Sequence, residues 1–424
     1  MSGPSDATGV PTVTLLVLMM SVFKVSIGYG VVLPMLPYLI ERLQGSAGDA
    51  AGVSRATGLL TGLYTLALFL FAPLWGHLSD RFGRRPVLFV GLAGLGATML
   101  TFAFIETLFA VYAERFLSGL FAAAVTPVAL AVIGDLATTE IARARRLTFV
   151  SLAGITGFLL GPMTGTFLTQ GTARWLPFAD SAGGSLTVPL AGTALLSILV
   201  SIAVLLTVSG RKRASPVGRT GSRTSESIAW LVPRLLALSF IVSAGIGVFE
   251  VGLALRGKQE LGLTPYQIAL MFTECSLVML IVQAIVFSPF VKPEWTRWLI
   301  APALAVLAGA LFLVPRATDF PTMLVAIGAV AASAGILSPI FTYWISSRAG
   351  AAQGVQMGRQ TAAASLGAAF GSAAGGLLFG LAWLPDASFL LAAALALSGV
   401  VVSIGLPRQL SPHRAMGDAE GDKA

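Results

Sequence analysis

Five ionisable residues lie within long apolar stretches of this sequence: Lys24, Glu114, Arg115, Glu250 and Glu274. An ionised side chain at bilayer depth costs at least about 2.5–3.5 kcal/mol on insertion scales, so such residues usually line a cavity or pair with one another. A carboxylate in an apolar cavity is suited to taking up and releasing a proton near neutral pH. These residues therefore predict proton exchange and charge-based binding of a small solute.

The apolar stretches that carry these residues are long enough to be membrane-spanning helices. Mean hydropathy is +0.86, and only 11% of the 424 residues are charged, against about 25% in soluble domains. A spanning helix needs about 20 mostly apolar residues. The sequence predicts an all-α membrane protein with twelve such runs, at approximately 12–39, 56–76, 86–104, 108–134, 147–169, 187–208, 229–253, 266–290, 297–315, 321–346, 357–382 and 387–406.

Basic residues predict the orientation of these helices. With a cytoplasmic N-terminus, seventeen Lys and Arg residues fall in inner loops and tails and six in outer loops, which favours both termini inside. The net charge of +8 does not indicate nucleic acid, because this charge lies mostly in short loops. The polar N-terminal stretch lacks the basic region of a signal peptide. We therefore expect a multi-pass protein of a cell membrane, the inner membrane in a bacterium.

The chain also predicts two related halves. Gly28-Tyr-Gly30 in the first run matches Gly245-Ile-Gly247 in the seventh at an offset of 217 residues, and the glycines at 157, 161 and 165 match those at 367, 371 and 375 at an offset of 210. Such repeats place a substrate site at their interface near the bilayer midplane. The expected parts are a tail (1–11), two six-helix bundles (12–208 and 229–406) joined by a basic linker (209–228), and a C-terminal tail (407–424).

The loop between the second and third runs reads GHLSDRFGRRPVL over residues 76–88. Glycine at position 83 permits the positive φ of a tight turn between two helices, while Asp80 can accept hydrogen bonds at a helix N-terminus. This loop closely resembles the signature of the major facilitator superfamily. The resemblance implies that the loop and an acidic residue at the inner end of the fourth run latch the two halves in the outward-open state. The implied latch residues are Gly76, Asp80, Arg81, Gly83, Arg84, Arg85 and Asp135.

The fifth run resembles a motif of proton-driven antiporters in the same superfamily. It contains Gly157, Gly161, Pro162 and Gly165, with Thr166 where the pattern ends in glycine. Small residues at four-residue spacing let helices approach closely, and proline bends a helix. The resemblance implies efflux of a small organic solute in exchange for protons.

Two further segments resemble tetracycline-type exporters. Arg115-Phe-Leu-Ser-Gly119 is similar to a fourth-helix motif whose arginine is tied to proton coupling, and the segment Gly28–Pro37 resembles the first helix of that group. One departure concerns the acidic residue that those exporters carry in helix one, because the aligned position here is Val25, beside Lys24.

Lys24 leaves two readings of the cargo open. A cavity lysine favours an anionic or zwitterionic solute, or it forms a salt bridge to Glu250 or Glu274. We therefore expect Lys24, Arg115, Glu250 and Glu274 to serve the substrate cavity and proton coupling, and we keep a symporter or uniporter that imports such a solute as the alternative to antiport.

The sequence offers no basis for an enzyme or a cofactor. It contains no nucleotide-binding loop and no nucleophile constellation, so we expect an ion gradient rather than ATP to supply the energy. Two histidines and the single cysteine, Cys275, do not make a soft metal site. A monomer that binds a small molecule and protons is the expected form, and a sensor or scaffold derived from a transporter is disfavoured by the intact loop at 76–88.

Overall fold

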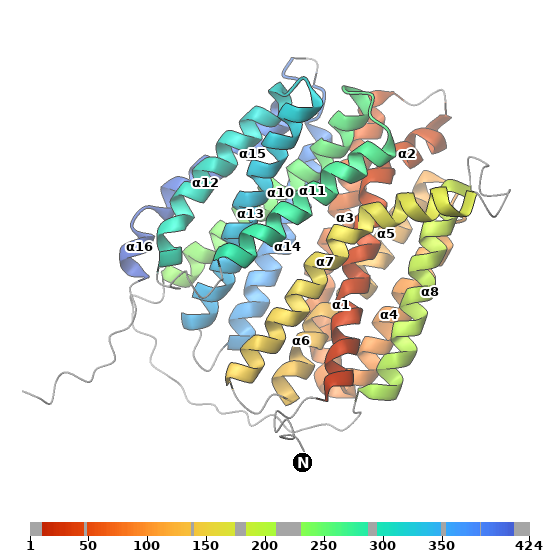
Figure 1. The fold of residues 1–424 in the computed structure, drawn as a ribbon, viewed down its shortest axis with the longest axis vertical. Coiled ribbons are helices and arrows are strands. Elements are labelled where there is room, and N and C mark those ends of the chain that lie inside the picture. Colours follow the sequence, from red (N-terminus) through yellow and green to blue (C-terminus); the bar gives the residue numbers. More distant parts are fainter. Residues whose placement is uncertain are drawn as a thin grey trace, which may run out of the picture.

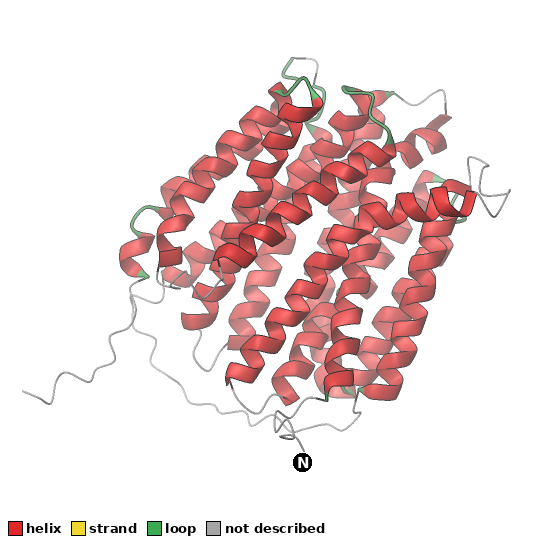
Figure 2. Cartoon of the chain, in the orientation of Figure 1, coloured by secondary structure: helices red, strands yellow, loops and turns green. Residues whose placement is uncertain are grey.

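The computed structural model describes residues 11–45, 49–136, 140–173, 184–208, 230–286, 295–348, 353–381 and 383–410. Helices make up nearly all of this part of the chain (Figure 2), and the described residues contain one isolated β-bridge, between Leu381 and Leu384. The predicted linker at 209–228 lies outside the described residues, so the division into the two predicted bundles stays a prediction as far as its boundaries are concerned.

The first six runs form the helices α1 to α8, which we call the N-terminal half (Figure 1). The first run is divided between α1, a 3₁₀ turn η1 and α2, and the fourth between α5 and α6. The bounds are α1 Thr12–Val32, η1 Leu33–Met35, α2 Leu36–Gln44, α3 Ala50–Phe82, α4 Arg84–Phe102, α5 Leu108–Ala122, α6 Val125–Leu136, α7 Glu140–Ala173 and α8 Gly184–Thr207.

The remaining six runs form the helices of the C-terminal half. The bounds are α10 Leu231–Gln259, α11 Pro265–Val286, α12 Thr296–Leu313 with the 3₁₀ turn η5 Val314–Arg316, α13 Phe320–Arg348, α14 Gln353–Leu377 and α15 Ala387–Ser403, followed by the short α16 Leu406–Gln409. By length and composition, ten of the described helical runs can cross a membrane. With α14 and the 17-residue α15, they confirm the predicted twelve-helix membrane fold.

Local sequence explains where these helices begin, end and break. The helix α3 extends beyond its apolar run because Asp49 caps its N-terminus, accepting a 2.6 Å hydrogen bond from the Gly52 N–H. At its other end Gly83 turns the chain into α4 with a φ of 102°, a conformation open to glycine. Between α5 and α6, Pro127 has no N–H for the carbonyl of Ala123, so the helix breaks there.

Corresponding helices pack in the same way in the two halves. The helix α1 lies along α7, and α10 lies along α14. In each pair glycines let the two backbones touch: a Cβ on Gly161 would lie 2.8 Å from the Gly30 Cα, and a Cβ on Gly371 would overlap the Ala244 carbonyl. This repeated packing supports the predicted relation between the halves.

The halves also contact each other directly. The helix α3 packs along α14, and α7 packs along α11. A Cβ on Gly58 would lie 2.6 Å from the backbone of Gly376, so the backbones of α3 and α14 touch near the N-terminus of α3. We call this end of the bundle the Gly45 end, and the opposite end, where α3 turns into α4, the Gly83 end.

Candidate functional site

The N-terminal half contains a buried ion pair on α5. Arg115 binds the adjacent Glu114 through two hydrogen bonds, from Nε to Oε2 at 2.6 Å and from Nη2 to Oε1 at 3.0 Å. Both side chains are 3% exposed. Ser118, one turn further along α5, donates to Glu114, and its hydroxyl oxygen lies 3.0 Å from that of Thr98. The carboxylate is therefore fully engaged within its own half, as a buried charge requires.

Aromatic rings cover the guanidinium of this pair. Arg115 lies 4.6 Å from the ring centre of Phe102 and 5.8 Å from that of Tyr64. Cation–π contacts of this kind strengthen when water is excluded. Arg115 is thus held by one carboxylate and two rings.

Lys24 on α1 is fully buried, and its Nζ has no hydrogen-bond partner among the described residues. The charges of Glu114 and Arg115 both act on it, and its Nζ lies beside Gly28 of its own helix. Lys24 is therefore grouped with the α5 ion pair rather than with Glu250, which has a different partner.

That partner is Tyr29, which donates a 2.7 Å hydrogen bond to Glu250 Oε2. Tyr29 belongs to α1 and Glu250 to α10, so this bond joins the two halves. The Tyr29 ring stacks on Tyr64 at 5.2 Å and on Phe158 of α7 at 5.9 Å. Tyr29 and Phe158 also pack against the hydrophobic core of the C-terminal half. A continuous line of contacts thus runs from Glu250 through Tyr29 and Tyr64 to Arg115.

Glu274 on α11 is separate from this line. Its Oε2 is buried and has no hydrogen-bond partner within the described part of the chain, and its Oε1 approaches α13, 3.1 Å from where a Cβ on Gly328 would lie. The charges of Glu250 and Glu274 both act on Cys275. The two carboxylates of the C-terminal half therefore both lie near that thiol.

The accessibility of these four charged residues differs between the halves. Lys24 is 0% and Arg115 2% exposed, whereas Glu250 and Glu274 are both half-buried. The positive charges predicted for the cavity are thus sealed inside the N-terminal half. Of the four charged residues, the more accessible ones are therefore the carboxylates of the C-terminal half.

The glycines of the fifth run bring α7 onto α1. A Cβ on Gly157 would overlap the Phe23 carbonyl, and a Cβ on Gly161 would lie 2.9 Å from the Ile27 carbonyl. Gly165 is less crowded, with its nearest neighbour at 3.5 Å. Pro162 lies within α7, and its ring is 3.1 Å from where a Cβ on Gly30 would lie. The described part of this motif therefore places α7, with Phe158, beside the Tyr29 segment.

The loop at the Gly83 end forms a small cluster of charges. Arg84 contacts Asp80 at 2.6 Å and Asp135 of α6 at 3.0 Å. It also donates to the Ser79 hydroxyl at 2.6 Å. The Asp80 side chain is 67% exposed, so this part of the cluster faces solvent.

The other predicted members of this loop have separate positions. Arg81 lies over the Phe82 ring at 5.4 Å, and the Arg85 Nε is buried with no hydrogen-bond partner among the described residues. A Cβ on Gly76 would meet nothing within 4 Å. The structure therefore brings Arg84, Asp80 and Asp135 together, and leaves open space at Gly76.

At the Gly45 end, polar contacts join the two halves. Lys258 of α10 contacts Glu41 at 2.6 Å, donates to the Pro37 carbonyl at 2.9 Å and lies 4.8 Å from the Tyr38 ring centre. Tyr38 in turn donates to the Leu263 carbonyl. We call these residues the Lys258 clamp. Together with the contact between α3 and α14, it closes this end.

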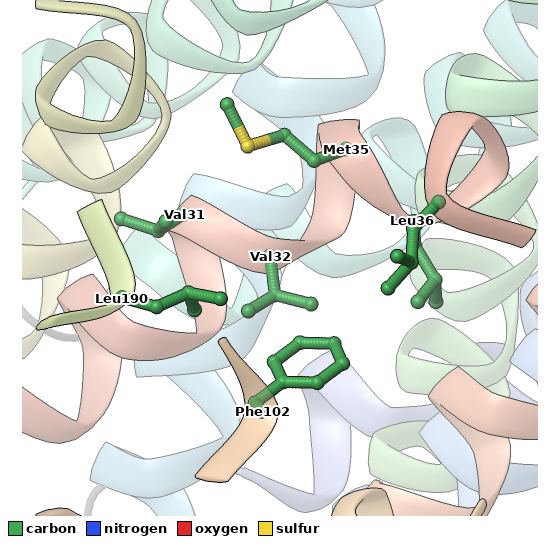
Figure 3. Close-up of a pocket in the computed structure, with 7 residues that line it drawn as sticks. Val31, Val32, Met35, Leu36, Phe102 and Leu190 are labelled. Carbon is green, nitrogen blue, oxygen red and sulfur yellow. The ribbon is translucent and has the colours of Figure 1, made fainter. Parts of the chain in front are cut away.

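A small apolar recess lies within the N-terminal half (Figure 3). It is formed by side chains of α1, η1, α2, α4 and α8, among them Val32, Leu36, Phe102 and Leu190. Its volume of about 10 Å³ is near the minimum for a single water molecule. Because its lining is entirely apolar and it is this small, it does not serve as a substrate site.

Several residues of this arrangement were not predicted from the sequence. The segment Gly28-Tyr-Gly30 was noted for its glycines, yet the tyrosine between them makes the bond to Glu250. Lys258 and Glu41 fall outside the apolar runs, where a charge ordinarily faces water. Tyr29 could have been identified from the sequence as a polar aromatic residue deep in an apolar run. For the Lys258 clamp the sequence carries no signal, because its partners come from different halves.

Within the described residues no group of three or more His, Cys, Asp or Glu side chains could hold a metal.

Comparisons with known proteins match nearly the whole chain. A sequence profile described as the Major Facilitator Superfamily matches residues 18–359. Multidrug resistance protein 1 of Bacillus subtilis (strain 168) is 28% identical over 374 residues, covering 87% of this chain and 90% of that protein. The crystal structure of the human organic anion transporter MFSD10 (TETRAN) aligns with a TM-score of 0.69 at 20% identity, over 93% of this chain and all of that one. The structure of a D-xylose-proton symporter aligns with a TM-score of 0.72 at 14% identity, covering 92% and 97%.

Proposed function

We propose that this chain, which belongs to the Major Facilitator Superfamily, exports a small organic cation in exchange for protons. Members of the family are secondary transporters and not enzymes, and the chain is a multi-pass membrane protein. The single observation that carries the proposal is the difference in accessibility between the charges of the two halves.

A cationic cargo follows from that difference. Lys24 and Arg115 are sealed in the N-terminal half, while Glu250 and Glu274 are half-buried in the C-terminal half. Charges inside a membrane protein mark the path of the substrate or ion, and the accessible ones here are carboxylates. They attract cations and repel organic anions. The alternative of importing an anionic or zwitterionic solute depended on an accessible Lys24, and the burial of this side chain argues against it.

Exchange with protons follows from competition for the same carboxylates. An ionised Glu250 or Glu274 binds a cation, and a protonated one does not. The cargo and the proton therefore occupy the site in turn, which is the requirement for antiport. The multidrug resistance protein of Bacillus subtilis supports this direction of transport by its similarity.

The conformation of the chain fits one stage of such a cycle. The Gly45 end is closed by the Lys258 clamp and by the backbone contact of Gly58 with Gly376. We place the Gly83 end, with its basic loop and the start of α1, at the cytoplasmic face. In this state the cargo enters from the cytoplasm, and the cluster of Asp80, Arg84 and Asp135 is the latch that closes the Gly83 end in the next state.

The test is flux in proteoliposomes that contain the purified chain. Ethidium, a planar organic cation, is expected to accumulate when the lumen is more acidic than the medium, and accumulation should vanish when an ionophore dissipates the pH gradient. Carboxyfluorescein, an aromatic anion, serves as the matched control and should not move. Glu250→Gln is expected to reduce gradient-driven uptake to the level of empty liposomes. Cation uptake that is indifferent to the pH gradient would rule out antiport, and gradient-driven movement of the anion alone would favour the importer.

A further inference from the structure

The hydrogen bond between Tyr29 and Glu250 crosses from one half to the other within the membrane. Its length is 2.7 Å, and the stacking of Tyr29 on Tyr64 and Phe158 fixes the ring in the N-terminal half. Glu250 lies about 12 Å from Lys258 along α10 at a rise of 1.5 Å per residue. The bond therefore acts on the same helix as the Lys258 clamp, two turns deeper.

The strength of this bond depends on the charge of its acceptor. A phenol donates a stronger hydrogen bond to an ionised carboxylate than to a neutral one. When Glu250 is ionised and empty, Tyr29 is its hydrogen-bond donor from the other half, and the bond favours the state closed at the Gly45 end. When a proton adds to Glu250 the charge is lost, and when a cation binds there the carboxylate acquires a competing partner. Either event weakens the bond between the halves.

We propose that Tyr29 is a positioning residue that holds the empty, ionised carrier in the state closed at the Gly45 end. Cargo or proton releases this hold, and the two halves then rock. An antiporter needs such a rule, because an empty carrier that changes conformation lets cargo flow without proton exchange. The role of Tyr29 in coupling rests on the proposed function, whereas its effect on conformation can be measured independently of transport.

Other titratable groups also lie near Glu250 and Tyr29. The charge of Glu250 acts on Cys275 of α11 and on Tyr29 of α1. Glu274 acts on that same thiol from its own helix, and the charge of Arg115 and the Tyr64 hydroxyl act on Tyr29 from the N-terminal half. Of these groups, Tyr29 is the one with a hydrogen bond to Glu250, and this bond crosses between the halves.

The first experiment measures conformation without transport. Spin labels at Arg55→Cys on α3 and Tyr266→Cys on α11, both exposed near the Gly45 end, are introduced into a Cys275→Ser background and their separation is measured as a function of pH. In the otherwise unaltered chain, acidification is expected to increase the ratio of molecules open at the Gly45 end to molecules closed there on the order of fivefold. Tyr29→Phe keeps the stacked ring and removes the hydroxyl. At high pH its ratio of open to closed molecules should therefore exceed that of the otherwise unaltered chain, and this ratio should not change with pH.

Two further variants keep this experiment decisive. Glu250→Gln cannot change its charge and should also show no pH response, even if Tyr29→Phe folds poorly. Tyr112→Phe, the same chemical change on α5, should retain the full response. A pH response that persists in Tyr29→Phe or in Glu250→Gln would overturn the inference.

The second experiment measures coupling. In proteoliposomes without a pH gradient, Tyr29→Phe is expected to increase ethidium flux down its own gradient, with fewer protons counted per cation moved. If the unaltered chain shows no proton-driven flux while the spin-label response is present, the proposed function fails and the Tyr29 inference stands. If proton-driven flux is present and Tyr29→Phe is as tightly coupled as the unaltered chain, the inference fails and the proposed function stands.

Discussion

The two halves share their helix packing and differ in their charge chemistry. In both, a glycine-rich helix lies against the first helix of the half, α7 on α1 and α14 on α10. In the N-terminal half, however, Arg115 is bound by Glu114 and two aromatic rings, and every charged group of the site is nearly inaccessible. In the C-terminal half, Glu250 and Glu274 are half-buried, and one Glu274 oxygen is buried without a hydrogen-bond partner in the described chain.

This difference indicates a division of labour between the halves. The buried ion pair of Arg115 and Glu114 is rigid, because breaking it leaves an unpaired charge in an apolar medium. A half-buried carboxylate with spare acceptor capacity can exchange partners instead. We therefore regard the N-terminal cluster as the fixed element and the C-terminal carboxylates as the elements that change state. Tyr29, which stacks on the first and binds the second, connects them.

The largest expected effect breaks the N-terminal cluster. Arg115→Met leaves Glu114 buried without its cationic partner, and removing one member of a buried pair costs about 3–5 kcal/mol. The expected result is a strongly lowered unfolding temperature in detergent, or failure to fold. The double variant Glu114→Gln with Arg115→Met removes both charges and should recover most of the loss.

The matching change in the other half sharpens the comparison. Glu250→Gln preserves an acceptor for Tyr29 and removes a charge that has no ionic partner among the described residues, so its unfolding free energy should stay within about 1 kcal/mol of the unaltered protein. Equal destabilisation by Arg115→Met and Glu250→Gln would contradict the division into a fixed and a switching half.

The second prediction concerns the packing that the halves share. A Cβ on Gly371 would overlap the Ala244 carbonyl, and backbone atoms cannot yield as a flexible side chain does. Gly371→Ala should therefore destabilise the fold by about 1–3 kcal/mol. Gly165→Ala is the control, since its Cβ would make ordinary contacts at 3.5 Å and more and alanine is the better helix former. The same thermal unfolding measurement checks both, and an unfolding temperature for Gly371→Ala equal to that of the control would refute the packing argument.

The sequence predicted the fold well because its signals are local. Each apolar run predicts one helical segment, although the first and fourth are broken into shorter helices, and the glycine at position 83 predicts one turn. The helix boundaries were missed where the helix continues past its apolar part, as in α3, whose capping residue Asp49 lies outside the run. The candidate site was predicted less completely. Lys24, Glu250 and Glu274 were identified from their charge within an apolar run, and Arg115 from its charge and from the motif that it begins.

The partners of these residues could not be predicted, because they depend on distances between segments far apart in the chain. Tyr29 and Glu250 are 221 residues apart, and nothing in either segment specifies the other. The burial of Lys24 likewise depends on how α1 is rotated against its neighbours. A helix with apolar residues on all faces carries little information about that rotation.

The third prediction weakens the Gly45 end. Lys258→Met removes the contacts with Glu41 and the Pro37 carbonyl and the cation–π contact with Tyr38. Because Glu41 is 63% exposed, solvent screens the ion pair, and the whole clamp should contribute about 1 kcal/mol. The expected outcome is a several-fold larger open fraction between spin labels at positions 55 and 266, with the pH response intact. Arg316→Met, on an exposed side chain in η5, is the control. A larger effect than that of Tyr29→Phe would assign the hold on the empty carrier to the clamp.

The smallest effect on stability is expected at the Gly83 end, from Asp80→Asn. In this conformation Asp80 is mostly exposed, and Arg84 retains Asp135 at 3.0 Å when the charge of Asp80 is removed. An exposed ion pair of this kind contributes between about 0 and 1 kcal/mol, so the unfolding temperature should hardly change. If the cluster is a latch, its contribution appears in the other state of the cycle, and Asp80→Asn should slow ethidium exchange while leaving its binding unaltered. Binding by fluorescence and exchange by flux separate the two. An unchanged rate of ethidium exchange would rule out the latch role, and loss of folding would make the loop a purely structural turn. Asp80 is exposed and replaceable in the present state, so it can affect transport only through a state in which its side chain is bound to a partner.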